Sequence, residues 1–152
     1  MSYVAISPMV DAGYWLTTRD GDPRANALYK RHYSAYHYKD GREHRRFVGP
    51  GERIVLLTFN CDALFVWRKF LSMDHQEGVN CAIFRNESPI LSSTLIREAE
   101  EIAWRRWPGE RFYTYVNPQK VASRNPGYCL KVCGWRSFGR TQGGLIVLEK
   151  LP

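Results

Sequence analysis

Two histidines and two tyrosines lie close together in the first third of the chain, at His32, Tyr33, Tyr36 and His37. Imidazole exchanges a proton near neutral pH, and a tyrosine hydroxyl can position a substrate, so His32 and Tyr33 are candidate catalytic residues. His32 and Tyr36 are four residues apart, as are Tyr33 and His37, so each pair would share one face of a helix. The alternatives are a histidine-bound metal, or aromatic rings that pack on the core with their polar edges in water.

A second polar group lies between a predicted strand and the helix that follows it. Ligands favour the carboxyl ends of central strands, so Asn86 and Ser88 are candidate catalytic residues. Arg85, Ser92 and Ser93 are candidate cofactor-binding residues, because the free N–H groups at the start of a helix attract anions. The alternative interpretation is that Ser92 or Ser93 only caps the helix.

Tyr113, Tyr115 and Asn117 alternate along one predicted strand and should therefore point to the same face. Phe112 and Thr114 should point to the other face. Tyr115 is a candidate catalytic residue, and Asn117 could contact a base edge or an amide of a cofactor. The alternative interpretation, which fits the pattern equally well, is a sheet face of tyrosines that packs beneath a helix.

The chain is strongly basic, with 22 Lys and Arg residues against 15 Asp and Glu residues and a formal net charge of +7. This balance favours a polyanionic partner, and nucleic acid ahead of a membrane surface. Basic residues interleaved with aromatic ones suit phosphate contacts together with base stacking, whereas the plainer interpretation is solvated charge on loops. The candidate nucleic-acid contacts form two patches: Lys39, Arg42, Arg45 and Arg46, and Lys120, Arg124, Lys131, Arg136 and Arg140.

Capping signals and hydrophobic periodicity predict the elements that must position these residues. Asp22 and Pro23 predict the start of a helix that continues to about Tyr36. A second helix is predicted over 93–107, with Ser92 or Ser93 as its cap and a buried stripe of apolar residues. That stripe consists of Leu95, Ala99, Ile102 and Ala103. The other predicted elements are a β-hairpin over 53–70 with its turn at 60–62, strands over 79–84, 111–116 and 143–151, and a short helix within 128–135.

This order of elements predicts an α/β (α+β) fold, in which helices flank a mixed central sheet. The unit 79–107 and the strand after it form a candidate right-handed crossover. The 152 residues are enough for one domain, 1–152, in which 1–21 is a turn-rich lead-in segment.

The four cysteines do not have the spacing of a zinc site, so we expect reduced and mostly buried thiols. No apolar run approaches the roughly 18 residues that span a bilayer. The first residues also lack the features of a secretory signal peptide, and a soluble cytoplasmic protein is therefore expected.

From about Asp22 to Glu149, the element order resembles the GNAT acyltransferase fold. The tail YCLKVCGWRSFG is similar to that family's short helix, which ends in a Gly-aromatic pair, here Gly134-Trp135. The family's R/Q-x-x-G-x-G/A loop, which holds the pyrophosphate of acyl-CoA, is replaced by the glycine-free segment 85–92. The tyrosine that often serves as general acid is replaced by Leu130.

A basic GNAT-like domain without the CoA loop resembles the Mom family of bacteriophage DNA-modification proteins, and the segments KRHYSAYHY and NPGYCLKVCGW suggest this similarity. The resemblance implies transfer of a small group from an unknown donor to the exocyclic amine of adenine in double-stranded DNA, which protects the DNA from restriction. The host cytoplasm would then be the place of action. Two other hypotheses are an acyl-CoA-dependent N-acyltransferase, acting on a protein or small molecule, and a non-catalytic DNA-binding anti-defence protein.

Overall fold

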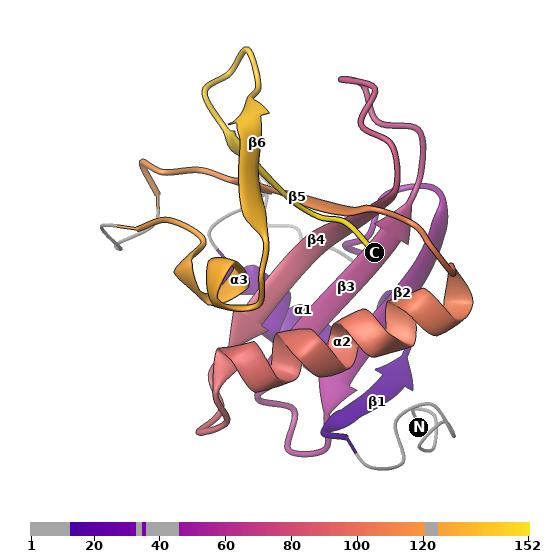
Figure 1. Ribbon diagram of the computed structural model, residues 1–152. Coiled ribbons are helices and arrows are strands. Elements are labelled where there is room, and N and C mark those ends of the chain that lie inside the picture. Colours follow the sequence, from indigo (N-terminus) through magenta and orange to yellow (C-terminus); the bar gives the residue numbers. More distant parts are fainter. Residues whose placement is uncertain (1–12, 33–34, 36–45, 121–124) are drawn as a thin grey trace, which may run out of the picture.

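The computed structural model describes residues 13–32, 35, 46–120 and 125–152. Within these residues, seven strands and three helices form an α/β fold with a mixed sheet flanked by helices, as predicted (Figure 1). In chain order the elements are β1 (Trp15–Thr18), α1 (Pro23–Lys30), β2 (Glu52–Thr58), β3 (Ala63–Lys69), β4 (Val79–Asn86), α2 (Ser92–Arg106), β5 (Phe112–Val116), α3 (Tyr128–Val132), β6 (Arg136–Arg140) and β7 (Ile146–Lys150). The strand order across the sheet is β1-β2-β3-β4-β5-β7-β6.

β4 and β5 are parallel neighbours, whereas the other neighbouring strands are antiparallel. The chain passes from β4 to β5 through α2, so the predicted crossover joins two parallel strands. The pairing between these two strands consists of Val79 with Phe112 and Asn80 with Tyr113. Beyond Asn80 the described parts of β4 and β5 separate, which opens the sheet at its centre.

β4 contains a β-bulge at the same place. Val66 of β3 pairs with Ile83 and the next residue, Trp67, pairs with Cys81, so Ala82 is an extra residue without a β3 partner. Bulges bend a strand and re-aim its side chains, and they are common beside functional sites. The bulge and the separation from β5 therefore distort the same part of β4.

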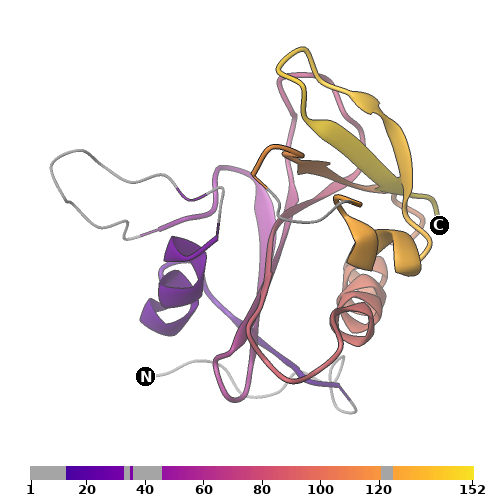
Figure 2. The ribbon, with the colours of Figure 1, turned by 90° about the vertical axis from the view of Figure 1, so that its left-hand side faces the viewer.

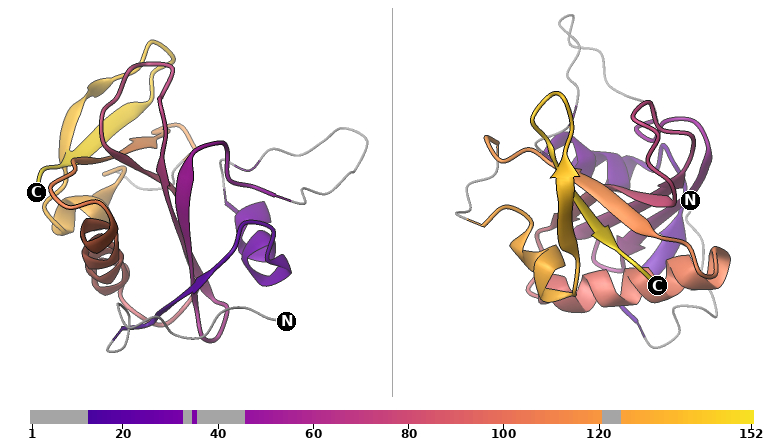
Figure 3. Two further views of the ribbon diagram at one scale, coloured as in Figure 1. Left: turned by 90° about the vertical axis from the view of Figure 1, so that its right-hand side faces the viewer. Right: turned by 45° about the horizontal axis from the view of Figure 1, so that its top comes forward.

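The helices cover opposite faces of the sheet: α1 lies on one face, and α2 and α3 lie on the other (Figures 2 and 3). The core on the α2 face is aromatic, and the ring of Phe112 lies 4.5 Å from that of Trp67 and 4.4 Å from that of Trp104. On the α1 face, Leu28 packs with Val55 and Val66 in a smaller aliphatic cluster. None of the described helices is both long and apolar enough to cross a membrane.

A buried ion pair joins α2 to the last strand. The Glu100 side chain is 3% exposed, and its carboxylate accepts hydrogen bonds from Lys150 Nζ at 2.6 Å and from Trp135 Nε1 at 2.7 Å. Lys150 also donates to the carbonyl oxygen of Cys133 at 2.7 Å. These contacts connect three parts of the chain, namely α2, β7 and the segment that follows α3.

The helices begin and end partly where the sequence predicts. Asp22 is the N-cap of α1 and Pro23 opens the helix, as predicted, but α1 ends at Lys30 instead of continuing to about Tyr36. It ends early because the Arg31 and His32 amides turn back to carbonyls three residues earlier, and because Arg85 of β4 and Glu87 after it hold Arg31. The predicted apolar stripe of α2 is buried as expected.

The cap predicted for α2 is wrong. Leu91 is the N-cap and makes no side-chain cap hydrogen bond, whereas Ser92 is the first helical residue. The Ser92 hydroxyl instead accepts a hydrogen bond from Asn86 Nδ2 at 3.0 Å. The serine that was expected to cap the helix is therefore bonded to the side chain of the last residue of β4.

Two short strands were missed by the sequence analysis. β1 lies inside the segment expected to be a turn-rich lead-in and pairs with β2, so Trp15 is fully buried. β6 lies in a segment to which the sequence analysis assigned no element, and its five residues are all exposed. β6 pairs with β7 at the end of the sheet, with a bulge at Phe138. Its exposed residues give no apolar alternation that would predict a strand.

Candidate functional site

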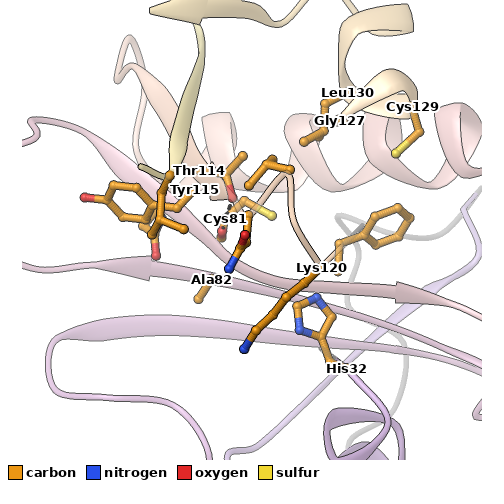
Figure 4. A pocket seen from close by; sticks show the side chains of 14 residues that line it. His32, Cys81, Ala82, Thr114, Tyr115, Lys120, Gly127, Cys129 and Leu130 are labelled. Carbon is orange, nitrogen blue, oxygen red and sulfur yellow. Dashed lines mark hydrogen bonds between the residues drawn. The ribbon is translucent and has the colours of Figure 1, made fainter. Parts of the chain in front are cut away.

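A pocket of about 530 Å³ opens where β4 and β5 separate (Figure 4). This volume falls in the range of roughly 300 to 1,000 Å³ that is typical of small-molecule sites. The bulged residue Ala82 lies in its wall. The lining residues are His32, Asn80, Cys81, Ala82, Phe84, Thr114, Tyr115, Val116, Asn117, Lys120, Gly127, Cys129, Leu130 and Leu145.

The pocket has an apolar part and a polar part. Cys129 and Leu130 belong to α3 and contribute apolar surface, whereas His32 and Lys120 lie beside each other on another side of the pocket (Figure 4). None of the described lining residues is acidic. The pocket therefore suits a ligand with an apolar or planar body and a group that accepts hydrogen bonds or carries negative charge.

His32 is the candidate catalytic residue that the structure places in this pocket with a strongly altered pKa. Burial, with a further contribution from the positive charge of Arg85, lowers the pKa of its imidazole to about 4, although a hydrogen bond with the Phe84 backbone acts in the opposite direction. The imidazole is therefore neutral at physiological pH and has one donor and one acceptor nitrogen. Such an imidazole has an acceptor nitrogen that can take a proton, and its lowered pKa makes it a weaker base than an ordinary histidine.

The helical arrangement predicted around His32 is wrong, because this residue follows the end of α1. Its position is instead set by an ion-pair network with β4. Arg31 donates two hydrogen bonds to Glu87, at 2.7 and 2.8 Å, and Arg85 donates to Glu87 at 2.7 Å and to the Arg31 carbonyl at 2.7 Å. These hydrogen bonds lower the pKa of Glu87 to about 2. Glu87, which lies in the glycine-free segment 85–92, thus helps to hold the residue before His32.

Asn86 and Ser88 hydrogen-bond within their own loop and do not line the pocket. Asn86 Oδ1 accepts from the Ser88 amide at 2.9 Å and from the Ser88 hydroxyl at 2.6 Å, and Asn86 Nδ2 donates to the Ile90 carbonyl at 2.8 Å. Ser88 Oγ in turn accepts from the Ile90 amide at 3.1 Å. Three amides of the loop between β4 and α2 thus already have partners, since the Glu87 amide donates to the Asp62 carbonyl at 2.7 Å, and Pro89 has no N–H to donate. Ser93 is not among the pocket residues either.

β5 and the turn after it supply the other predicted residues of the pocket. The rings of Tyr113 and Tyr115 meet edge to face with centroids 5.7 Å apart, in agreement with their predicted common face. The Tyr115 hydroxyl donates to Asp74 Oδ1 at 2.6 Å, and burial together with this hydrogen bond raises its pKa, so it stays protonated. Asn117 accepts from the Gln119 amide at 3.0 Å, in a turn that brings Lys120 over the pocket.

The candidate nucleic-acid contacts have different surroundings. Arg46 and Lys120 are exposed, and Arg140 is an exposed residue of β6 that contacts the Gly144 carbonyl. Lys131 donates to Asn125, and Arg136 pairs with Glu149 at 2.8 Å while its side chain stays 68% exposed. Seven residues singled out in the sequence lie outside the described part of the chain, namely Tyr33, Tyr36, His37, Lys39, Arg42, Arg45 and Arg124.

The sequence analysis assigned no site role to Asn80, Cys81 and Cys129, which line the pocket. All four cysteines are free thiols, and burial raises the pKa of both Cys81 and Cys129, so neither is an activated nucleophile. Thr114 Oγ1 donates to the Cys81 carbonyl at 2.7 Å, so a β5 side chain satisfies a β4 backbone group near the point where the strands separate.

Among the described residues there is no group of three or more histidine, cysteine, aspartate or glutamate side chains that could hold a metal ion. No protein-family model and no curated protein matches this chain.

Proposed function

We propose that this chain is a GNAT-like transferase, most similar in kind to the Mom proteins, that transfers a small group to the exocyclic amine of adenine in DNA. The observation that carries the proposal is the pocket between β4 and β5, in which a neutral imidazole lies beside a lysine. The predicted elements follow one another in the predicted order, with β1 added before α1 and β6 added between α3 and β7. The choice of adenine rests on the Mom resemblance alone.

The reaction needs a base, because the amine of adenine is a weak nucleophile that loses a proton as it reacts. In the proposed step, the amine nitrogen forms a bond to the electrophilic carbon of the donor, and the donor's leaving group departs with its bonding electrons. His32 takes the proton released from the amine. A side chain positioned for such a transfer accelerates a reaction by about 10² to 10⁴.

The electrostatics of the chain favour an acceptor that is part of a polyanion. The formal net charge is +7, Lys120 is exposed at the pocket, and the described lining residues include no carboxylate that would repel a phosphate. A base inside a duplex must leave the stack before an enzyme can modify it. The amphipathic pocket has a volume suited to a planar base together with a small donor.

The loop between β4 and α2 argues against acyl-CoA as the donor. The amide of Ser88 is bonded to the side chain of Asn86, and the amide of Ile90 is bonded to the side chain of Ser88. A pyrophosphate would have to displace these bonds. We therefore propose a small donor without a pyrophosphate, and this loop disfavours the acyl-CoA-dependent alternative.

Mass spectrometry of nucleosides tests the proposal directly. Plasmid DNA is isolated from cells that express this chain and from cells that express the His32→Asn variant, and is digested to nucleosides. We expect a deoxyadenosine of increased mass only with the wild-type chain, and the added mass identifies the transferred group. Unchanged nucleosides in DNA to which the wild-type chain binds would contradict the enzyme and favour the non-catalytic DNA-binding protein.

The ion-pair network predicts that Glu87→Gln lowers the rate of modification by about 10- to 100-fold, because a displacement of about 1 Å at a catalytic group has an effect of this size. Glutamine cannot pair with both Arg31 and Arg85, so the residue before His32 loses its anchor on β4. Rates of nucleoside modification and melting temperatures are measured for this variant and for Glu101→Gln, an exposed glutamate on α2. Equal rates for the two variants would show that the network does not position His32.

A further inference from the structure

The loop between β3 and β4 (residues 70–78) has an inverted pattern of burial. Leu71 is 88% exposed and Met73 is 99% exposed, whereas Ser72 between them is 4% exposed. A serine is ordinarily found outside and a leucine or methionine inside, so the loop presents its apolar side chains against the usual preference. The loop projects beyond the ends of the strands that it joins (Figure 1).

Hydrogen bonds hold the loop in this conformation. Ser72 Oγ accepts from the Gln76 amide at 2.7 Å, and the His75 amide donates to the Ser72 carbonyl at 3.1 Å. Arg111 donates to the Gln76 side chain at 3.0 Å and to the Glu77 carbonyl at 2.8 Å. Leu71 and Met73 are therefore exposed by a turn that hydrogen bonds hold in place.

The loop is joined directly to the pocket. The Asp74 carboxylate accepts the Tyr115 hydroxyl at 2.6 Å, and Tyr115 lines the pocket. Met73 directly precedes Asp74 in the chain, and Asp74 is hydrogen-bonded to a residue of the pocket wall. The Asp74 carboxylate is also paired with the Gln76 side chain at 3.3 Å.

Cationic side chains flank the base of the loop. The Arg68 guanidinium lies 3.5 Å from the ring centroid of Phe70, at the start of the loop. The Arg111 guanidinium at the other end lies 4.9 Å from the ring of Phe138, which is 58% exposed on β6. Exposed apolar side chains next to guanidinium groups suit a partner whose phosphates lie on its surface and whose apolar base faces lie inside.

From this arrangement we infer that Leu71 and Met73 form a wedge that inserts between base pairs of duplex DNA when the neighbouring base enters the pocket. The inference rests on the proposed function. Proteins that kink or open a duplex commonly insert leucine or methionine between base steps, and a base that leaves the stack creates a gap for an apolar side chain. The overall charge favours DNA over an apolar protein surface, because the chain carries a formal net charge of +7. The loop itself carries the exposed acids Asp74 and Glu77, and Arg111 is paired with Glu149 at 2.7 Å.

The experiment measures DNA unwinding, which needs no knowledge of the target sequence. A nicked circular plasmid is sealed by ligase in the presence of saturating protein, and its topoisomers are separated after the protein is removed. An inserted wedge untwists the duplex, so we expect the wild-type chain to shift the topoisomer distribution and the double variant L71A/M73A to shift it at least about fivefold less at equal DNA occupancy. Phe59→Ala removes a side chain that is 78% exposed in the turn between β2 and β3, at the opposite end of β3, and should shift the distribution as the wild-type chain does.

The outcomes separate the wedge from the proposed function. Equal shifts by wild-type and double variant, or DNA binding by the wild-type chain without any shift, would overturn the wedge and leave the modification untouched. Absence of DNA binding by the wild-type chain would overturn the proposed function and the wedge together. Binding to anionic phospholipid vesicles that the double variant loses would assign the loop to a lipid surface and also overturn the wedge.

Discussion

Replacing His32 by asparagine should abolish DNA modification, with a fall in rate of about 10² to 10⁴, while DNA affinity changes little. Asparagine is smaller and polar, so it can occupy the wall of the pocket without introducing a charge, but it cannot accept the proton of the amine at neutral pH. DNA affinity should remain because it depends on lysine and arginine contacts with phosphates and not on a neutral imidazole. The measurements are the rate of nucleoside modification and the salt dependence of DNA binding by the same purified variant.

The pH dependence of the wild-type rate is part of the same prediction. Because the folded-state pKa of His32 is about 4, below its ordinary value of 6.5, the imidazole remains a competent base at pH values well below neutrality. Protonation removes its acceptor nitrogen, so the rate should stay level from about pH 8 to about pH 5 and fall as the pH drops through about 4. An inflection near 6.5 would contradict the desolvated position of His32.

A variant that fails to fold would give the same loss of activity, so folding has to be measured separately. The melting temperature of His32→Asn should stay near that of the wild-type chain, because His32 lies after α1 and is only partly buried. A folded variant that modifies DNA at the wild-type rate would contradict the catalytic assignment. A variant that does not fold would mean that the imidazole serves packing.

The elements that the sequence predicts well are those defined by local signals. The hairpin of β2 and β3 follows from two runs of β-branched and aromatic residues around a short turn, in which Cys61 takes a positive φ of 59°. α2 follows from its apolar stripe, whose residues are buried where the periodicity places them. Such features depend on neighbours within a few residues, and a single sequence contains that information.

The pocket could not be predicted in the same way, because contacts between distant parts of the chain create it. The separation of β4 from β5 and the bulge at Ala82 arise from strand pairing. The pairing of Glu87 with Arg31 joins residues 56 positions apart, so the sequence gives the charges but not their distance. The predicted residues His32, Tyr115, Asn117 and Lys120 are brought together there, whereas Asn86 and Ser88 hydrogen-bond in the adjacent loop.

Removal of the buried carboxylate of Glu100 should cause a large loss of stability. Glu100→Ala removes the acceptor of the Trp135 N–H and leaves the Lys150 ammonium with the Cys133 carbonyl but without a carboxylate, in a place where Glu100 itself is 3% exposed. Breaking a buried ion pair on one side costs about 3 to 5 kcal/mol. For a chain of this size each kcal/mol lowers the melting temperature by roughly 2 to 4 °C, so a fall of at least about 6 °C is expected in thermal unfolding followed by circular dichroism.

Two further variants separate the lost ion pair from the lost volume of the side chain. Glu101→Ala removes the neighbouring, exposed glutamate of α2 and should change the free energy of unfolding by less than about 0.5 kcal/mol. Glu100→Leu combined with Lys150→Met replaces both charges by apolar groups of similar size, and it should recover much of the stability, since the unpaired charge and not the cavity dominates the loss. If the double variant were no more stable than Glu100→Ala, the hydrogen bond to Trp135 or the packing of α2 would be the larger contribution. The comparison therefore measures how much of the attachment between α2 and β7, which together flank the strands around the pocket, depends on charge.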